Sequence, residues 1–322
     1  MKFTNFMIGV LVAGFTAVSD ARAQAKPVRV VVPYPPGGGM DFVARTAFQR
    51  LGETTKQIFV IENRSGASGT IGADAVAKSA PDGLTMLVAS PAEILVGSIA
   101  GQKVPYDTER DLTPVTLIGE TPLVIAAHPS VAARSLPEVF ALARREPGKL
   151  SYGSPGSGST MHFAGESLNA IAGISIMHVP YRGAAPVVTD LLGGQVPLGI
   201  VGMPPTVQYA KSGRLRVLAV TSSERSVAMP DVPAVAELPG FTGYRFTNWM
   251  GIFVPAKTPR PAVEHLALQM AKVVHEPQTS EKLLSQGVNP VGNSPSEFVA
   301  FLKDERERYS KIAKERHIHT EE

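Results

Sequence analysis

The feature that most constrains this chain is a unit of buried strand, glycine-rich turn and helix that occurs once in each half. The first unit has an apolar run at residues 28–32, the turn PYPPGGGMD at residues 33–41 and helical spacing at residues 42–51. The second has the turn GSPGSGST at residues 153–160, followed by helical spacing at residues 161–171. A continuous apolar strand is typical of a parallel sheet that is covered on both faces. We therefore predict an α/β fold, and the repetition favours two similar lobes.

Each of these turns is a candidate binding site for an anion. A helix that starts at such a turn leaves its first backbone N–H groups unpaired at the positive end of the helix dipole. Glycine lets a ligand come close to those N–H groups. Two such turns that face each other across a cleft would bind a small carboxylate. The alternative, that the turns are only tight connections, stays open at this point.

The rest of the chain continues the alternation of strands and helices. We expect strands at residues 58–62, 85–89, 123–127, 176–179, 198–201, 215–221 and 251–254. We expect helices at residues 70–78, 136–144, 187–192, 262–274, 280–286 and 296–314. A third glycine-rich turn occupies residues 63–69, and residues 230–244, rich in proline and glycine, are predicted to form an irregular loop.

The N-terminus carries the three parts of a secretory signal peptide. Lys2 is followed by an apolar stretch at residues 6–18 and by small residues suited to cleavage after Ala23 or Ala25. The stretch is shorter than the roughly 20 residues of a membrane-spanning helix. We predict that residues 1–25 are removed and that the mature protein lies in the periplasm. The roughly 300 residues that remain exceed one typical core and favour two domains.

Composition argues against several classes of protein. The 322 residues include no cysteine, so the exported chain has neither disulfides nor a lipid attached through a thioether. The net charge is +3, and removal of residues 1–25 takes away two positive charges and one negative charge. No block of lysine and arginine stands out, so we expect no nucleic-acid partner.

Known catalytic motifs are missing from the sequence. No serine lies in Gly-x-Ser-x-Gly, and the first turn matches neither the phosphate-binding loop nor the dinucleotide fingerprint. We expect no catalytic residue and no cofactor, and an exported enzyme stays a less favoured alternative. Of seven histidines, His317 and His319 lie close together in a charged tail without a third ligand, so we expect no metal site.

Three single residues have two interpretations each. His162 follows the second turn, and it either lines the cleft or caps and packs at the start of a helix. Asp41 lies where a helix N-cap is expected, and we expect it mainly to shape the first turn or to accept hydrogen bonds from a ligand amine or water. Trp249 is the only tryptophan, and we expect it to pack in the core rather than contact a ligand.

Several motifs together resemble the Bug-type solute-binding proteins of tripartite tricarboxylate transporters. They are PYPPGGGMD followed by Ala44 and Arg45, ENRSGASG at residues 62–69, PDGLT at residues 81–85, YGSPGSGS at residues 152–159, VPYRGAAP at residues 179–186, DLLGGQV at residues 190–196 and PAKTP at residues 255–259. They occur in the order expected of that family, over nearly the whole mature chain.

The resemblance implies a type II periplasmic binding protein fold, with two Rossmann-like lobes, a hinge and a ligand cleft. Lobe 1 would hold residues 26–123 and 250–322, and lobe 2 would hold residues 124–249. Such a protein captures a small mono-, di- or tricarboxylate, aromatic acids included, and delivers it to a membrane permease without catalysis, cofactor or metal. We expect a monomer whose partners are the permease subunits. A periplasmic ligand sensor that acts on a membrane signalling partner remains the alternative.

The resemblance also nominates ligand-binding residues, which would act through backbone amides, hydroxyls and bridging waters. The nominated residues are Tyr34, Gly37, Gly38, Gly39, Asp41, Ser90, Ser154, Gly158, Ser159 and Thr160, with Tyr181, Gly183 and Ala184 on the other side. One departure is that the acidic residue common in the family after residue 196 is missing, which would disfavour a ligand with a free amine. The lobes would close about a hinge near residues 123–127 and 249–254.

Overall fold

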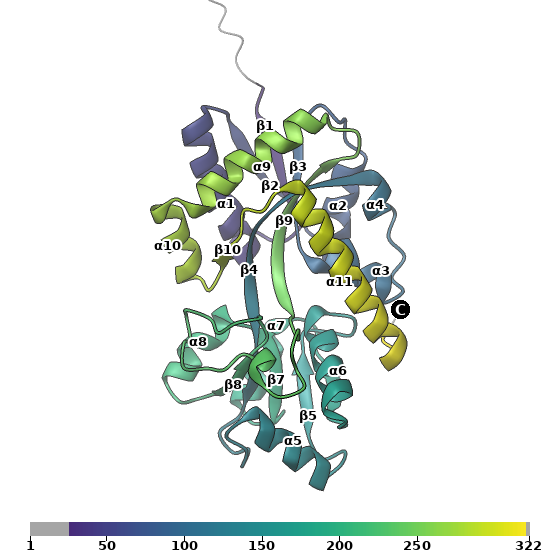
Figure 1. The fold of residues 1–322 in the computed structure, drawn as a ribbon, viewed down its shortest axis with the longest axis vertical. Coiled ribbons are helices and arrows are strands. Elements are labelled where there is room, and N and C mark those ends of the chain that lie inside the picture. Colours follow the sequence, from purple (N-terminus) through teal and green to yellow (C-terminus); the bar gives the residue numbers. More distant parts are fainter. Residues whose placement is uncertain (1–25, 320–322) are drawn as a thin grey trace, which may run out of the picture.

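The computed structural model describes residues 26–319, and all elements named below lie in this range. The predicted signal peptide, residues 1–25, lies outside the described residues. The molecule is elongated, with one group of strands and helices at each end (Figure 1). The long strands β4 (Leu112–Ala127) and β9 (Thr247–Pro255) run between the two groups.

The first group is built on a parallel sheet. Strand β1 (Val28–Val32) pairs in parallel with β2 (Phe59–Asn63) and with β3 (Thr85–Ala89). Helices α1 (Gly39–Thr55) and α2 (Thr70–Ala77) connect these strands. Three of the five residues of β1 are completely buried, as the apolar run predicts for a strand with helices on both sides.

The second group repeats this arrangement. Strand β5 (Ser151–Ser154) pairs in parallel with β6 (Met177–Pro180) and with β7 (Leu198–Gly202). The helices of this group are α5 (Leu136–Arg145), α6 (Thr160–Ala172), α7 (Ala184–Leu192) and α8 (Pro204–Lys211), and β8 (Arg216–Val220) adds a further strand. The predicted strands and helices of both groups are confirmed to within a few residues at their ends, but α8 has no counterpart among the predicted helices.

Strand β4 joins the two groups and is much longer than the sequence predicts. It has 16 residues, and the sequence indicates only residues 123–127. Its first part pairs antiparallel with β9, and its last part pairs antiparallel with β7 and β8. The pairing with β9 shifts register twice, next to Pro114 and next to Gly119. Proline and glycine interrupt the apolar pattern of a strand and indicate a turn. The sequence therefore does not predict that β4 continues from one group into the other.

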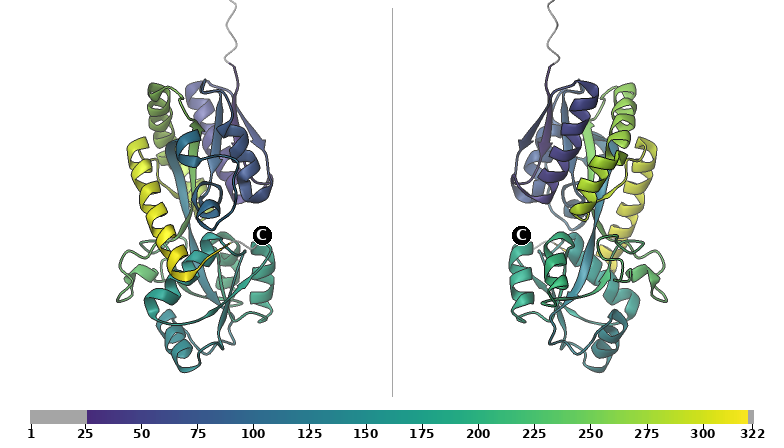
Figure 2. Two further views of the ribbon diagram at one scale, coloured as in Figure 1. Left: turned by 90° about the vertical axis from the view of Figure 1, so that its right-hand side faces the viewer. Right: turned by 90° about the vertical axis from the view of Figure 1, so that its left-hand side faces the viewer.

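The C-terminal part of the chain consists mainly of helices: α9 (Arg260–His275), α10 (Pro277–Ser285) and α11 (Pro295–Arg316), with the short strand β10 (Asn289–Pro290) before α11. Helix α11 begins with a capping box between Ser294 and Glu297. It runs beside both groups in Figures 1 and 2.

Helix α11 contacts both groups of strands. Near its start, the ring of Phe298 lies 6.0 Å from that of Trp249 in β9, and Trp249 is completely buried, as expected. Near its end, the ring of Tyr309 lies 5.0 Å from that of Phe163 in α6, and Arg316 donates a hydrogen bond of 2.8 Å to Glu166 in the same helix. The division into residues 26–123 plus 250–322 and residues 124–249 stays a prediction, and α11 adds a third connection beside β4 and β9.

Several short elements fill the connections. A 3₁₀ turn, η1 (Ala67–Gly69), precedes α2, and a π-helix, η2 (Ala92–Val96), continues into α3 (Gly97–Ile99) after β3. Helix α4 (Thr108–Asp111) precedes β4, and the predicted loop at residues 230–244 is irregular except for η3 (Val235–Glu237). Within residues 26–319, no helix combines the length and the apolar character that crossing a membrane requires.

Candidate functional site

The two glycine-rich turns lie at the carboxyl ends of parallel strands, one in each group. In Figure 1, β1 begins at the upper end of the molecule, so the turn that follows it points toward the second group. Strand β5 begins beside α5 at the lower end, so the turn that follows it points toward the first group. Carboxyl ends of parallel strands are where α/β folds bind ligands.

Asp41 shapes the first turn, but it is not the N-cap of the helix. Gly38 is the N-cap, and Asp41 lies in the first turn of α1 with its side chain almost completely buried. Its carboxylate accepts hydrogen bonds of 2.9 Å from the N–H of Gly37, from Arg45 and from Asn63. The expectation of an N-cap is therefore wrong, because the helix begins three residues earlier than expected, at Gly39. The expectation that Asp41 shapes the turn agrees with these contacts.

These hydrogen bonds favour the ionised form of Asp41 and occupy the N–H of Gly37. Hydrogen bonds from Arg45 and from the Gly37 amide lower the pKa of Asp41 to about 2. Because the N–H of Gly37 points to that carboxylate, it is not free for an anion. The N–H groups of Gly38, Gly39 and Met40, by contrast, find no acceptor within residues 26–319.

Gly38 and Gly39 do not need to be glycine for the sake of the fold. Gly38 has an ordinary extended conformation, with φ −77° and ψ 169°. A Cβ on Gly38 would lie 3.6 Å from the Pro35 carbonyl oxygen, an ordinary contact, and a Cβ on Gly39 would meet nothing within 4 Å. Gly37 differs, because its φ of +81° is one that other residues rarely adopt. Open space over two amides is what the approach of a ligand to the backbone requires.

Behind the first turn lies a buried carboxyl group that the sequence analysis missed. Glu93, in η2, accepts hydrogen bonds from Tyr34 at 2.9 Å and from the hydroxyl and the N–H of Ser90 at 2.6 and 2.7 Å. Burial raises the pKa of Glu93 to about 7, and burial together with the nearby Glu93 raises the pKa of Tyr34. The signal was present in the sequence: serine followed three residues later by glutamate is the spacing of a capping box.

The second turn is held by its own side chains. Ser159 is the N-cap of α6, accepts a hydrogen bond of 3.2 Å from the N–H of His162 and donates one of 2.7 Å to the Gly156 carbonyl. The N–H of Gly158 donates to the ring of His162 at 3.1 Å, so this amide is not free. His162 therefore caps the helix start, which is one of its two expected roles. In the described chain, the N–H groups of Ser157, Thr160 and Met161 have no acceptor.

Two of the nominated hydroxyl groups are committed or buried in this turn. Ser154 is completely buried, and its Oγ donates to the Gly156 carbonyl at 3.1 Å and lies 2.7 Å from Nε2 of His178. Thr160 is 6% exposed, so its side chain belongs to the packing of α6. The second turn therefore offers an anion its backbone more than its side chains.

The pair of Ser154 and His178 does not have the geometry of a catalytic nucleophile and base. The ring of His178 stacks on that of His162 with centroids 3.8 Å apart, and burial and the neighbouring ring lower the pKa of His178 to about 3. No carboxylate hydrogen-bonds to His178 in the part of the chain that the structure describes. Burial of Ser154 also removes it from any substrate.

The nominated residues at the start of α7 lie beside the second turn. The N–H of Gly183 donates to the Pro155 carbonyl and the N–H of Tyr181 donates to the Ser154 carbonyl, both at 3.0 Å. The Tyr181 hydroxyl donates to Asp190 at 2.9 Å, and Gly183 has a φ of 108°, which favours glycine. Ala184, exposed, is the first residue of the helix.

The structure thus collects the nominated residues into two sets. One set lies around the carboxyl ends of β1 and β3 and comprises Tyr34, Gly37, Gly38, Gly39, Asp41 and Ser90. The other lies around the carboxyl ends of β5 and β6 and comprises Ser154, Gly158, Ser159, Thr160, Tyr181, Gly183 and Ala184. Among residues 26–319, no group of three His, Cys, Asp or Glu side chains is placed to hold a metal ion.

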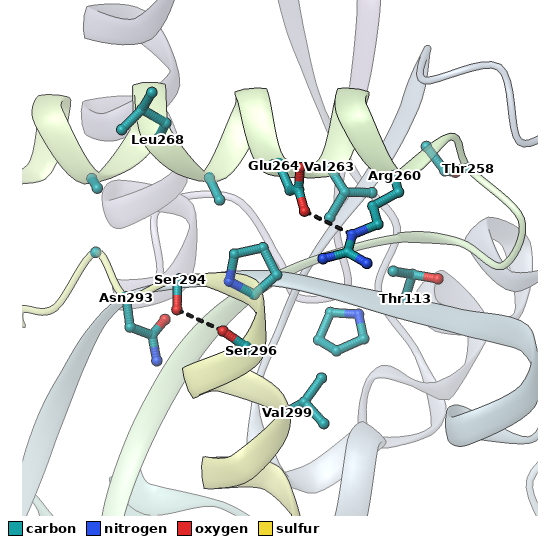
Figure 3. Close-up of a pocket in the computed structure, with 15 residues that line it drawn as sticks. Thr113, Thr258, Arg260, Val263, Glu264, Leu268, Asn293, Ser294, Ser296 and Val299 are labelled. Atoms are coloured by element: carbon teal, nitrogen blue, oxygen red, sulfur yellow. Dashed lines mark hydrogen bonds and ion pairs between the residues drawn. The ribbon is translucent and has the colours of Figure 1, made fainter.

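A pocket of about 780 Å³ lies away from these turns, between α9 and the start of α11 (Figure 3). Its rim carries the ion pair of Arg260 with Glu264, and Ser294 and Ser296 lie at the start of α11. None of the nominated residues lines it. We therefore place the candidate site at the two turns, since both carry amides without an acceptor in the described chain and the first also has open space above them.

Comparisons with known proteins bear on the family and the fold of the chain. The family model described as "Tripartite tricarboxylate transporter family receptor" matches residues 43–318. Protein BugT of Bordetella pertussis is 35% identical over 321 residues, which cover 98% of each chain.

Two similar proteins have solved structures with a small acid. Rpa4515 of R. palustris, described with adipate, is 34% identical with a TM-score of 0.79, and the match covers 92% of this chain and 98% of that one. MatC from Rhodopseudomonas palustris, described with bound malate, is 28% identical with a TM-score of 0.73, and the match covers 89% of this chain and 98% of that one. The predicted family resemblance and the predicted fold class, that of periplasmic solute-binding proteins, are both confirmed.

Proposed function

The chain belongs to the tripartite tricarboxylate transporter receptor family, and from this premise we propose that it binds a small carboxylate in the periplasm and delivers it to a membrane permease. The adipate and malate of the two similar structures make dicarboxylates of four to six carbons the first ligands to test. The protein does no chemistry on the ligand in this proposal.

The observation that carries the proposal is the pair of turns with unpaired amides. Gly38, Gly39 and Met40 at the start of α1, and Thr160 and Met161 at the start of α6, have N–H groups without an acceptor in the described chain. Each set lies at the positive end of a helix of more than ten residues, which favours an anion. Both sets derive from main chain, so a carboxylate would be bound without burial of a lysine or arginine.

The contacts of the turns refine which nominated residues would touch the ligand. The amides of Gly37 and Gly158 and the hydroxyls of Ser154 and Tyr181 already have partners inside the protein. We assign these groups to the shape of the turns. The amides of Gly38 and Gly39 on one side, and of Thr160 on the other, are the proposed direct donors.

Delivery requires that the permease distinguish the loaded protein from the empty one. Closure of the two groups about β4 and β9 would do this if the ligand contacts both groups, since binding shifts a conformational equilibrium only through contacts that differ between the states. Helix α11 would have to bend or slide, because it contacts both groups.

The test is a screen of acids by thermal shift, followed by calorimetry. The panel comprises succinate, malate, adipate, citrate and benzoate, with the amine-bearing aspartate as a comparison. A ligand at 100 times its Kd stabilises the protein by about 2.7 kcal/mol. The acid should be recovered unchanged after incubation. Absence of any shift, or consumption of an acid, contradicts the proposal.

Transport is tested separately from binding. A strain that lacks the protein should lose uptake of the labelled acid that the screen identifies, and regain it with the wild-type chain. Normal uptake in that strain would favour a sensor of the same ligand.

A further inference from the structure

Glu93 is a buried carboxyl group without a cationic partner, directly behind two nominated binding residues. It is 3% exposed, and no lysine, arginine or histidine pairs with it within residues 26–319. The π-helix that carries it is held from the other side by Tyr106, whose hydroxyl donates to the Glu93 carbonyl at 2.7 Å. A π-helical turn of this kind is often found at functional sites.

The oxygens of Glu93, Ser90 and Tyr34 form a closed triangle. Oε2 of Glu93 lies 2.6 Å from Ser90 Oγ and 2.9 Å from the Tyr34 hydroxyl, and these two hydroxyls lie 3.1 Å from each other. The other carboxyl oxygen, Oε1, accepts the N–H of Ser90 at 2.7 Å. Tyr34 is half-buried whereas Ser90 and Glu93 are buried, so it is the member of the triangle that a ligand at the first turn would contact.

The charge of Glu93 decides which way these hydroxyl groups donate. An ionised carboxylate only accepts, so the hydrogens of Ser90 and Tyr34 both point to Oε2. A ligand carboxylate also only accepts. With Glu93 ionised, Tyr34 therefore has no hydrogen to offer a ligand, and two negative charges oppose each other across it.

We propose that Glu93 takes up one proton from solution when the protein binds its carboxylate ligand. The proton bonds to Oε2, which then donates to Ser90 Oγ. Ser90 in turn donates to the oxygen of Tyr34, and Tyr34 donates to the ligand. No covalent bond of the ligand changes, and the two hydroxyl groups only rotate. This inference rests on the proposed carboxylate binding at the first turn and names the residue that makes it dependent on pH.

The surroundings place this proton exchange near neutral pH. Burial raises the pKa of Glu93 to about 7. The titratable and charged groups around it, taken element by element, are Tyr34, Tyr106, Asp74 of α2 with its partner Lys78, and Lys303 and Arg306 of α11 beyond Ile94 and Leu95. Burial also lowers the pKa of His162, and burial together with the neighbouring ring lowers that of His178 to about 3, so both histidines at the second turn are shifted toward the neutral form.

The experiment is calorimetry of adipate binding to the full mature chain at pH 6, 7 and 8, in two buffers that differ in ionisation enthalpy. A pKa near 7 in the free protein predicts uptake of about 0.1, 0.5 and 0.9 proton per ligand, and a Kd about tenfold higher at pH 8 than at pH 6. Malate and benzoate serve as second and third probes.

Glu93→Gln fixes the arrangement of the protonated state, because its amide donates where the carboxylic acid would and still accepts the N–H of Ser90. It should bind with no proton uptake and with the same Kd at pH 6 and pH 8. Tyr106→Phe is the matched control, since it alters the same π-helix but leaves the carboxyl group untouched. It should retain the uptake of the parent.

Each result has a distinct meaning. Binding of an acid by the parent with no proton uptake between pH 6 and 8 overturns the inference and leaves the proposed function standing, even if Glu93→Gln fails to fold. Uptake that persists unchanged in a folded Glu93→Gln also overturns it. Failure of the parent to bind any acid at any of these pH values removes the proposed function, and the inference with it.

Discussion

Replacement of Gly38 by valine tests whether the backbone of the first turn binds the ligand. The extended conformation of Gly38, with φ −77° and ψ 169°, is one that valine adopts readily. The nearest atom to its Cβ would be the Pro35 carbonyl oxygen at 3.6 Å, so the side chain fits the free protein. The added methyl groups would then occupy the space above the amides of Gly38 and Gly39.

The expected effect on binding is large and that on stability is small. A hydrogen bond to a charged group contributes about 1.5–3 kcal/mol, so loss of one is a Kd increase of about 10- to 100-fold. Glycine is replaced at an N-cap without a side-chain hydrogen bond, so the free energy of unfolding should fall by about 1 kcal/mol or less. Calorimetry with adipate and thermal unfolding without ligand measure the two effects.

The matched control is Gly193→Val at the end of α7. Gly193 also has an ordinary conformation, with φ −84° and ψ −2°, and its Cβ would lie 3.5 Å from the Thr189 carbonyl oxygen. It should bind like the parent. If Gly38→Val also binds like the parent while Arg182→Ala abolishes binding, the backbone model is wrong and the exposed arginine at the start of α7 replaces it.

Three further predictions concern stability and closure. The pKa of Asp41 is lowered from 3.8 to about 2, so its carboxylate contributes about 2 kcal/mol to the free energy of unfolding above about pH 4, and this contribution is lost as the pH falls to about 2. Asp41→Asn should therefore reduce the dependence of stability on pH between about pH 4 and pH 2, as measured by denaturant unfolding. Arg316→Ala should lower the free energy of unfolding by about 1–3 kcal/mol and expose the end of α11 to proteases, because Glu166 is left buried with Tyr152 as its remaining hydroxyl partner. Ligand should change the scattering profile of the protein if the groups close about β4 and β9, and superimposable profiles with and without adipate would contradict closure.

Much of the fold is predictable from the sequence because its signals are local. The apolar run at residues 28–32 and the glycine turn after it specify a buried strand and a helix start without any knowledge of the rest of the chain. The same holds for β3 and for α6. Strand β4 is the exception, since its first part depends on pairing with β9, more than a hundred residues away, and contains the proline and glycine that elsewhere indicate turns.

The candidate site is less predictable because it depends on which hydrogen bonds are already made. The sequence points to Gly37, Gly38 and Gly39 alike, but only the fold brings Asp41 to the amide of Gly37 and leaves the other two open. The importance of Glu93 also depends on a contact between distant parts of the chain, since its partner Tyr34 lies 59 positions earlier in the sequence. A serine–glutamate spacing alone indicates a helix cap and says nothing of a partner beyond it.

Some donors of the two turns are hydrogen-bonded within the protein and others have no acceptor there, and this difference bears on ligand specificity. Main-chain amides recognise a carboxylate as such, and they cannot tell adipate from malate at the bound end. Selection among acids must then come from groups that meet the rest of the ligand, and near the second turn the side chains of Tyr181 and Asp190 are paired with each other while Arg182 is exposed. A change of Arg182 should therefore alter the ranking of acids in the panel more than the affinity for the simplest of them. Changes at Gly38 should weaken all of them alike.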